Sequence, residues 1–264
     1  MMKLTVLMEN TTSQPELVCT HGLSVYLESS AQRILFDMGP GAQFAQNAQA
    51  LGVDLAAVDY AVLSHGHYDH GGGLDVFLRR NDHAPVYLRQ GAFLPHTDAA
   101  GKNIGLAANL QSHARLIETG PFTRIDQNAL LFSDVTGTAF QSPINTALLE
   151  CGAPDRFSHE QNLLLWEGEK LFLFGGCAHC GIVNILEKAA HLAGRMPDVV
   201  FSGMHLSVGA SAPVSFTRAL AEKLLEYPCV FYTCHCTGME PYQEMKPILK
   251  DRLHYAAAGD IFVL

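Results

Sequence analysis

Four side chains that can bind a metal ion crowd into one short loop of the sequence. His65, His67, Asp69 and His70 lie within six consecutive residues, directly after the apolar run Tyr60 to Ser64. Imidazole and carboxylate groups are good ligands for zinc, iron and manganese. In an extended loop, His65 and His67 point to the same side and can form a pair. A turn into a helix would then direct Asp69 and His70 towards a second ion.

The alternative for this segment is a polar, histidine-rich loop that binds nothing. Burying such groups at the end of an apolar strand without partners would be unfavourable by roughly several kcal/mol. Gly71, Gly72 and Gly73 follow the loop, and glycine allows the tight turns and close backbone approach that a metal loop needs. The sequence therefore favours a metal site.

Further histidines stand at the ends of predicted strands, namely His159, His205 and His235. For His205, a hydrogen bond to a backbone carbonyl explains the residue as well as a role in substrate binding or proton transfer does. The same holds for His21, which precedes a predicted strand. We expect the remaining histidines at the surface or in loops: His83, His96, His113, His191 and His254. Two of them, His96 and His113, are also candidates to line a pocket.

The cysteines form two clusters. The chain has seven cysteines, and this odd number does not favour a disulfide framework. The clusters are Cys177-Ala178-His179-Cys180 and Cys234-His235-Cys236. Together they allow a closed structural zinc site or a redox pair as alternatives. Neither alternative accounts for the first histidine-rich loop.

The bulk composition describes a folded protein. With 264 residues, 48% hydrophobic and 16% charged residues, one large domain spanning residues 1–264 is the simplest organisation. The net charge of −9, without a cluster of basic residues, argues against nucleic acid as the main partner. No signal peptide and no apolar stretch of about 18 residues is present. We expect a cytoplasmic protein that binds a small molecule and no membrane, and the oligomeric state stays open.

The elements that must position these residues follow from short apolar runs bounded by turn residues. The predicted strands are Leu4 to Met8, Leu23 to Glu28, Arg33 to Asp37, Tyr60 to Ser64, Val86 to Leu88, Asn162 to Trp166, Lys170 to Gly175, Val199 to Gly203, Val230 to Cys234 and Asp260 to Leu264. The predicted helices are Ala42 to Leu51, Gly72 to Arg79, Ile182 to Leu192, Ser215 to Tyr227 and Tyr242 to Arg252.

Each half of the chain begins with a predicted hairpin and continues with strands that alternate with helices. This order predicts an α/β (α+β) fold with two mixed sheets packed face to face and helices outside, and it suggests an ancient duplication. The segment 90–141 is rich in Gly, Asn and Ala and fits no clear pattern. We expect it to be an insertion or a lid near the site.

The loop from His65 to His70 resembles the His-x-His-x-Asp-His signature of the metallo-β-lactamase superfamily. Further motifs between His21 and Gly238 resemble one branch of it, whose members are metal-dependent hydrolases or similar to 7,8-dihydropterin-6-methyl-4-(β-D-ribofuranosyl)aminobenzene-5'-phosphate synthase. They are His21-Gly22-Leu23-Ser24, Leu35-Phe36-Asp37-Met38-Gly39, His159-Glu160-Gln161-Asn162-Leu163, Gly176 to Asn184, Gly203-Met204-His205-Leu206 and His235-Cys236-Thr237-Gly238.

The resemblance implies a four-layer αββα sandwich of two mixed β-sheets with the site at one end. It implies one or two divalent ions, zinc first, with iron or manganese as alternatives. It also implies two sets of ligands: His65, His67 and His159 for one ion, and Asp69, His70 and His235 for the other. Asp37 would orient a ligand histidine through a hydrogen bond.

One departure from the superfamily pattern concerns the strand Lys170 to Gly175. The superfamily commonly has a bridging Asp after this strand, whereas this chain has Cys177, with His179 two residues on. The thiolate of Cys177 could bind the second ion. Alternatively, His179 could point into the site while Cys177 is merely buried. A cysteine ligand would favour zinc or iron over magnesium.

The leading hypothesis for function is metal-assisted hydrolysis. A bound ion lowers the pKa of water to about 7, and the resulting metal-activated hydroxide would attack an ester, phosphoester or lactone. Asp69 would hold an ion and accept a proton from the nucleophile. His205 would stabilise the leaving group, and His21 and His205 are candidates for substrate binding.

Two other classes of function remain open. A transferase similar to the pterin synthase would exclude water from its site, and product analysis with a pterin diphosphate would separate it from a hydrolase. A non-catalytic metal-dependent ligand sensor is the third class. A complete set of ligands argues against it, because a sensor can lose such residues without harm.

Overall fold

Two seven-stranded mixed sheets form the middle of the computed structural model, which describes residues 1–264. The strand order of the first sheet is β19-β1-β2-β3-β4-β5-β7, and that of the second is β18-β17-β14-β13-β12-β9-β8. The first sheet contains β1 (Lys3–Met8), β2 (Ser24–Glu28), β3 (Arg33–Phe36), β4 (Tyr60–Val62), β5 (Val86–Arg89), β7 (Leu116–Thr119) and β19 (Ile261–Val263). The second contains β8 (Phe122–Arg124), β9 (Ala129–Phe132), β12 (Asn162–Glu167), β13 (Lys170–Phe174), β14 (Val199–Phe201), β17 (Val230–Thr233) and β18 (Leu253–Tyr255).

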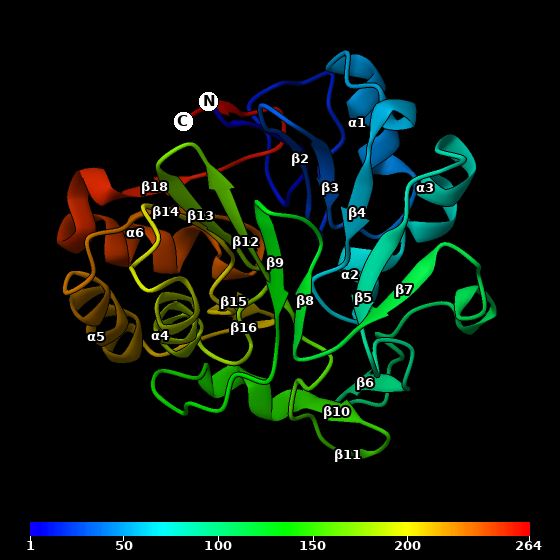
Figure 1. Ribbon diagram of the computed structural model, residues 1–264. Coiled ribbons are helices and arrows are strands. Elements are labelled where there is room, and N and C mark those ends of the chain that lie inside the picture. The colour runs from blue at the N-terminus through cyan, green and yellow to red at the C-terminus, as the bar shows by residue number, and fades with distance from the viewer.

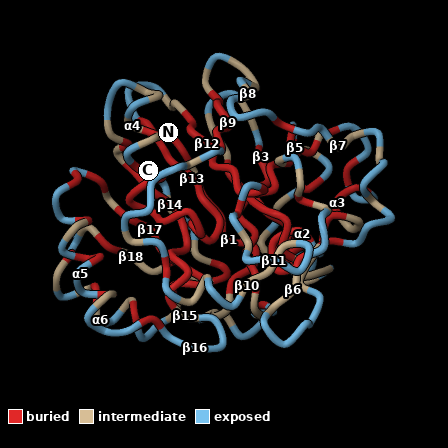
Figure 2. Tube along the Cα trace, turned by 90° about the horizontal axis from the view of Figure 1, so that it is seen from below, coloured by how far each residue is buried: buried red, intermediate tan, exposed pale blue.

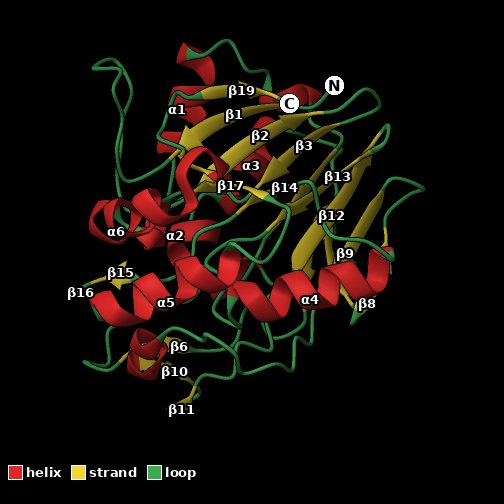
Figure 3. Ribbon diagram, turned by 90° about the vertical axis from the view of Figure 1, so that its left-hand side faces the viewer, coloured by secondary structure: helices red, strands yellow, loops and turns green.

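Helices cover the outer face of each sheet (Figure 1). Buried side chains of α1 (Gln43–Ala50) and α3 (Leu74–Arg80) pack on the first sheet. Those of α4 (Ile182–Ala193), α5 (Val214–Leu224) and α6 (Met239–Leu249) pack on the second, and Figure 3 shows α4 and α5 lying across it. The predicted four-layer αββα sandwich is therefore confirmed.

The core between the sheets follows from the alternation of side chains along each strand. On β12, Leu163 and Leu165 point to the other sheet, while Leu164 packs under the helices. On β13, Phe172 and Phe174 are likewise fully buried between the sheets. Strands that are apolar on both faces need a cover on both sides, and Figure 2 shows these inner strands as the buried part of the chain.

The two sheets repeat one pattern of neighbours. In the first sheet, β1, β2 and β3 pair antiparallel, and β3, β4, β5 and β7 pair parallel. In the second, β9, β12 and β13 pair antiparallel, and β13, β14, β17 and β18 pair parallel. This agreement supports the duplication that the order of the predicted elements suggested.

Every strand and helix named from the sequence is present, with shifts at the ends. The strand predicted over Tyr60 to Ser64 ends at Val62, because the N–H of Ser64 donates to Asp37 Oδ1 instead of a neighbouring strand. The helix predicted to start at Tyr242 starts at Met239. The helix predicted over Gly72 to Arg79 is α3, and a further short helix, α2 (Tyr68–Gly71), forms within the metal loop before it.

Smaller elements gather at the end of the sandwich where α2 lies (Figure 1). They are the three-stranded sheet β11-β10-β6, the hairpin β15-β16 and the short 3-10 helices η3 (Pro143–Ala147) and η4 (His235–Thr237). The strands are β6 (His96–Asp98), β10 (Leu148–Glu150), β11 (Ala153–Pro154), β15 (Ser207–Val208) and β16 (Ala210–Ser211). Three other 3-10 helices, η1 (Leu55–Ala57), η2 (Ala108–Leu110) and η5 (Lys250–Arg252), precede β4, β7 and β18.

The segment 90–141 takes part in several of these structures. It supplies β6 to the small sheet, β7 to the first large sheet, and β8 and β9 to the second. The chain ends meet in the first sheet, where β1 pairs with β19. None of the helices has the length and apolar character that crossing a bilayer requires.

Candidate metal centre

The histidine-rich loop joins β4 to α2 and packs closely on the loop after β3. His67 is the residue that precedes the first turn of α2. The two loops pack so closely that a Cβ atom added to Gly73 would collide with the carbonyl oxygen of Met38. Only glycine fits at this place. The packing brings the carboxylate of Asp37 under the loop, where it accepts hydrogen bonds from the N–H and the hydroxyl of Ser64.

Asp37 determines which ring nitrogen of His70 carries the hydrogen. The Nδ1 atom lies 2.6 Å from Asp37 Oδ2, and a carboxylate can only accept, so Nδ1 carries the hydrogen and Nε2 keeps a lone pair. Nε2 lies 3.2 Å from Cys177 Sγ and 3.2 Å from His235 Nε2. Burial lowers the pKa of His70, but Asp37 and Asp69 outweigh it and raise the pKa to about 9. Without a metal ion, this ring therefore holds a second proton at neutral pH.

The Nε2 atom of His235 lies close to the Nε2 atom of His70. Its Nδ1 lies 2.8 Å from Asn10 Oδ1, and the amide of Asn10 is oriented by its bond to the His235 carbonyl. Nδ1 is therefore the donor. The backbone N–H of His235 is held by the buried carboxylate of Glu9, and Nε2 lies 3.1 Å from Asp69 Oδ2.

The spacing of these atoms suits a metal ion. Asp69 Oδ2 lies 3.7 Å from His70 Nε2, so the three sides of the triangle formed with His235 Nε2 are 3.1, 3.2 and 3.7 Å. Two ligands of a tetrahedral zinc ion with bonds of about 2.0–2.1 Å stand about 3.3 Å apart. The carboxylate and the two imidazoles therefore match the edges of such a site.

His65 is fixed by the same network as His70. The hydroxyl of Ser64 donates to Asp37 Oδ2 at 2.7 Å, so the oxygen accepts from His65 Nδ1, which lies 2.9 Å away. His65 Nε2 is then a lone pair, and it is buried without a partner.

His179 follows the same rule through a different partner. Its Nδ1 lies 3.0 Å from Asn145 Oδ1, and the Asn145 amide donates to the His179 carbonyl at 2.7 Å, which fixes the orientation of the amide. Nδ1 therefore carries the hydrogen, and the buried Nε2 has no partner. Glu160, which is also buried, accepts the N–H groups of His179 and Cys180 and holds this loop in place.

The nitrogen atoms of His65, His67 and His179 lie within 4.8 Å of one another. All three Nε2 atoms are buried without a hydrogen-bond partner. Burial, with neighbouring imidazoles, lowers the pKa of each ring well below its usual value. The rings are therefore neutral at pH 7, and each has a buried ring nitrogen without a hydrogen-bond partner. An unpaired buried group costs about 1–3 kcal/mol, which a shared cation would offset.

The cysteines do not form the closed zinc site that their spacing allowed. Cys177 and Cys236 lie near His205, whereas Cys180 belongs to the core under the helices and Cys234 to the core between the sheets. Burial, with the neighbouring Cys236, raises the pKa of the Cys177 thiol well above its usual value. Cys177 therefore stays protonated unless a cation draws its proton off.

A cavity of about 260 Å³ opens onto this centre. His67, Asp69, Cys177 and His179 form part of its wall, and the residues around them are His21, Tyr68, Asp98, Lys102, Ile104, Ile144, Ala147, Leu148, His205, Val208 and Gly209. Three of these residues belong to the segment 90–141, which therefore contributes one wall of the cavity. The cavity has the mixed apolar and polar lining of a small-molecule site.

Two further predicted site residues, His21 and His205, line this cavity beside the other imidazoles. His21 Nε2 lies 3.1 Å from Asp69 Oδ2. The N–H of His205 donates to Cys236 Sγ, its Nδ1 is buried without a partner, and its backbone has a φ of +47°. A positive φ is unusual for a residue other than glycine and is typical of functional sites.

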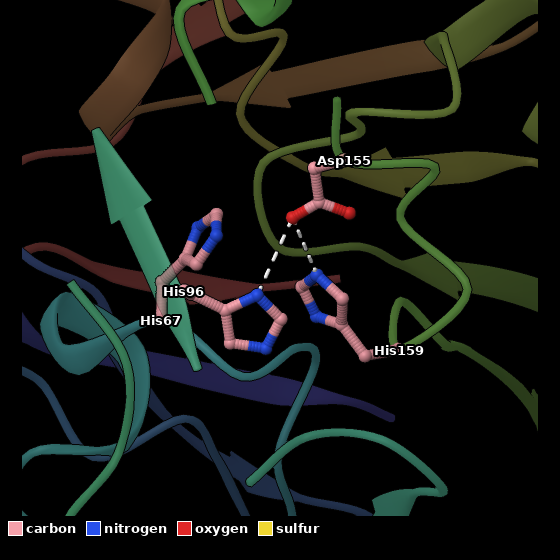
Figure 4. Close-up of side chains that lie close together, drawn as sticks. All are labelled: His67, His96, Asp155 and His159. Carbon is pink, nitrogen blue, oxygen red and sulfur yellow. Dashed lines mark hydrogen bonds and ion pairs between the residues drawn. The ribbon is translucent and has the colours of Figure 1, made fainter. Parts of the chain in front are cut away.

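His159 lies beside the other imidazoles but is turned differently. Its Nδ1 accepts the N–H of Gly66 at 3.0 Å, and its Nε2 lies 3.2 Å from Asp155 Oδ2. Figure 4 shows Asp155 facing both His159 and His96. The expectation of a surface or loop position for His96 is wrong, because this residue in β6 is fully buried.

Several residues of the centre had no signal in the sequence. Asn10, Ser64 and Asn145 place the protons of ligand-type histidines, and Asp155 and Glu160 hold their loops. The two amide contacts join segments far apart in the chain: Asn10 lies 225 residues from His235, and Asn145 lies 34 residues from His179. Only an amide or hydroxyl brought close by the fold can act in this way, so spacing could not reveal it.

Comparison with known proteins finds a matching family model and a similar solved structure. The family model of the Metallo-beta-lactamase superfamily matches residues 17–183. A solved structure, Tm1679, described as a metal-dependent hydrolase of the beta-lactamase superfamily, superimposes with a TM-score of 0.83 at 26% identity, covering 100% of this chain and 99% of that one.

Two proteins of Methanocaldococcus jannaschii are similar in sequence. An uncharacterized protein is 26% identical over 92% of this chain and 93% of its own length. The 7,8-dihydropterin-6-methyl-4-(beta-D-ribofuranosyl)-aminobenzene-5'-phosphate synthase is 26% identical over 91% of this chain and 89% of its own length. The similarity extends over nearly the whole chain in both cases.

Proposed function

This chain belongs to the metallo-beta-lactamase superfamily, and we propose that it is a metal-dependent hydrolase that cleaves a small ester, phosphoester or lactone with the help of two divalent ions. The observation that carries the proposal is the set of buried Nε2 lone pairs beside the cavity. Four histidines have their Nδ1 hydrogen fixed by an acceptor of the protein, and each directs the opposite nitrogen inward: His65, His70, His179 and His235.

We assign the second ion to Asp69, His70 and His235, with Cys177 as a further ligand. The first ion takes His65, His67 and a third imidazole, for which His159 and His179 are the candidates. Zinc fits this set best, because imidazole and thiolate groups are its usual ligands, and iron or manganese is the alternative. When bound, such ions lower the pKa of water to about 7 and offset charge that develops on the substrate.

The chain's own side chains handle the substrate and the proton. Burial alone would raise the pKa of Asp69, but His70, His21 and His235 lower it well below the usual range. Asp69 therefore stays a carboxylate and holds His21 Nε2 at 3.1 Å. The Asp69–His21 pair lines the cavity and is placed to accept a proton from the attacking water.

His205 is the second group placed for chemistry. It lines the cavity, and its Nδ1 has no partner within the protein. We assign it to the leaving group, to which it would donate a hydrogen bond or a proton. Apolar side chains of Ile104, Ile144 and Val208 line the same cavity and would hold the uncharged part of the substrate.

A transferase is the second candidate, because the synthase of M. jannaschii matches this chain as well as the uncharacterized relative does. In that case the same centre would orient two reactants and exclude water. The wall from segment 90–141 is the part of the cavity that would do so.

The experiment is a turnover assay of zinc-loaded protein on panels of phosphodiesters, lactones and thioesters in water enriched in oxygen-18. A hydrolase places the heavy oxygen in the product, whereas a transferase makes a product that joins two substrates and contains none. The variant His70→Ala should lose turnover and one ion, and His83→Ala, at an exposed position, is the matched control. Full turnover by His70→Ala would contradict the proposed function.

A further inference from the structure

The ring proton of His159 is arranged in the opposite sense to those of His65, His70, His179 and His235. We propose that His159 positions the metal loop without binding an ion, and that His179 is the third imidazole ligand of the first ion. This inference rests on the proposed function, because it concerns the ligands of the same centre. It departs from the ligand set that the resemblance to the superfamily implied.

The argument begins with the backbone N–H of Gly66, which can only donate. It lies 3.0 Å from His159 Nδ1, so Nδ1 must hold a lone pair. A neutral imidazole carries its hydrogen on the other nitrogen, and His159 Nε2 therefore donates to Asp155 Oδ2 at 3.2 Å. Both nitrogens are used, and no lone pair of this ring is left for a cation.

Asp155 is built into the structure as the acceptor. Its side chain is fully enclosed, and Oδ1 accepts the N–H of Phe157 at 2.6 Å. His96 Nδ1 lies 3.4 Å from Oδ2, so the carboxylate stands between two imidazoles, as Figure 4 shows. Burial raises the pKa of Asp155, but these hydrogen bonds outweigh it and hold the pKa below its usual range. Asp155 is therefore ionised and can only accept.

Gly66 is the link between this pair and the ligands. It lies between His65 and His67, and a Cβ at this position would collide with the carbonyl oxygen of Ala92. The backbone at Gly66 is thus in close contact with Ala92 and hydrogen bonded to His159. Fixing this peptide sets the directions of the two imidazoles on either side of it.

The hydrogen-bond partners of His179 give its ring the opposite tautomer to that of His159. Asn145 Oδ1 accepts from Nδ1, so Nε2 is a lone pair, and it is buried without a partner. His179 also belongs to a group with His65 and His67 in which one ring nitrogen of each residue lies within 4.8 Å of the others. The ring is stacked on Phe157 with 4.4 Å between the centroids and 3° between the planes. Because Phe157 also donates to Asp155, one short segment places the positioning residue and the ligand together.

Nitrogen-15 NMR of histidine-labelled protein tests both assignments. In metal-free protein we expect the Nε2–H tautomer for His159 and the Nδ1–H tautomer for His179. After loading with cadmium-113, the Nε2 resonance of His179 should split through coupling to the metal, and that of His159 should not. Coupling at His159 would overturn the proposal. Signals are assigned from spectra of the variants His159→Asn and His179→Asn.

Metal content of the same variants gives an independent result. An Asn at position 159 keeps an acceptor for the Gly66 N–H, so His159→Asn should retain the full number of ions, and His179→Asn should lose one. His159→Leu removes the acceptor and should weaken the affinity of the first ion by about 10- to 100-fold, the usual effect of losing a supporting hydrogen bond. Loss of an ion in His159→Asn, with none lost in His179→Asn, would also overturn the proposal.

Failure of the proposed function would look different. Wild-type protein that binds no cadmium at all would contradict the metal centre and with it the role of His179. The tautomer of His159 would still be measured in that protein. An Nδ1–H signal there would contradict its hydrogen bond with Gly66 on its own.

Discussion

The Nε2 atoms of His70 and His235 lie 3.2 Å apart, although the Nδ1 hydrogen of each ring is held by an acceptor on its outer side. Two lone pairs at this distance repel each other unless a proton or a cation stands between them. In metal-free protein the raised pKa of His70, about 9, supplies a proton. A divalent ion that displaces this proton would bind both rings and Asp69 at once.

Asp37→Asn is expected to weaken binding of the second ion by about 10- to 100-fold. An amide in this position can turn its NH₂ group towards His70 Nδ1, which favours the wrong tautomer and removes the lone pair from Nε2. The measurement is a zinc titration against a competing chelator. Asp75→Asn, in an exposed ion pair on α3, is the control and should keep wild-type affinity. An unchanged affinity in Asp37→Asn would show that the carboxylate does not set the proton of His70.

Much of this centre could be predicted where ligand residues follow one another in sequence. The loop from His65 to His70 is an example, because a strand end and a helix start fix its geometry locally. The difference between His159 and His179 could not be predicted, since both are histidines beside strands. It depends on which donor or acceptor the fold brings to Nδ1, a backbone N–H in one case and Asn145 in the other.

The same limit applies to the fold. Strands and helices followed from apolar periodicity, and the sandwich followed from their order. The burial of His96 did not, because the strand that carries it, β6, has only three residues and pairs with β10. So short a strand has too few residues to show a pattern, and its partner lies about 50 residues later in the chain.

Metal removal should lower the thermal stability of the protein. Ligand at 1,000 times its Kd stabilises the native state by about 4 kcal/mol, and each kcal/mol shifts the Tm of a chain of this size by about 2–4 °C. Zinc-loaded protein should therefore melt roughly 8–16 °C above metal-free protein. Differential scanning calorimetry with and without a chelator measures the shift. His83→Ala should behave like the wild type, and an equal Tm in both states would exclude a metal that binds the native fold.

The stability of the metal-free protein should pass through a maximum near pH 6.5. Burial lowers the pKa of His65, His67 and His179. Below the unfolded-state pKa of about 6.5, these histidines are protonated in the unfolded chain but stay neutral in the native protein. The free energy of unfolding therefore decreases as the pH falls. His70 acts in the opposite direction. Its pKa is raised to about 9, so its stabilising proton is lost as the pH rises from about 6.5 through 9.

Urea unfolding of metal-free protein between pH 5 and pH 9 measures this profile. In the variant His70→Gln the decline on the alkaline side should be reduced, while the decline on the acid side should persist. A free energy of unfolding that rises steadily from pH 5 to pH 9 in the wild type would contradict the raised pKa of His70. A free energy that does not fall between pH 6.5 and pH 5 would contradict the burial of the other three rings in their neutral form.

Lys102 should set a preference for substrates that carry a negative charge. It is the one lysine or arginine that lines the cavity, and it forms no ion pair with a carboxylate of the protein. Asp98, the acidic residue nearest in the turn, instead accepts the N–H groups of Ala100 and Lys102 through Oδ1. The ammonium group of Lys102 lies 5.7 Å from the centre of the Tyr68 ring, at the cavity wall. It is therefore available to bind an anionic group of a substrate.

Lys102→Ala should therefore raise the KM for anionic substrates roughly 10- to 100-fold, because a charge-assisted hydrogen bond contributes about 1.5–3 kcal/mol. It should leave kcat and the metal content nearly unchanged. Steady-state kinetics on a matched pair of substrates, one with a carboxylate or phosphate and one with a neutral group in its place, measure the effect. Lys102→Arg should retain most of the preference, and Lys170→Ala, at an exposed strand end, should leave it intact. Equal changes for the anionic and the neutral substrate would show that Lys102 shapes the cavity without recognising charge.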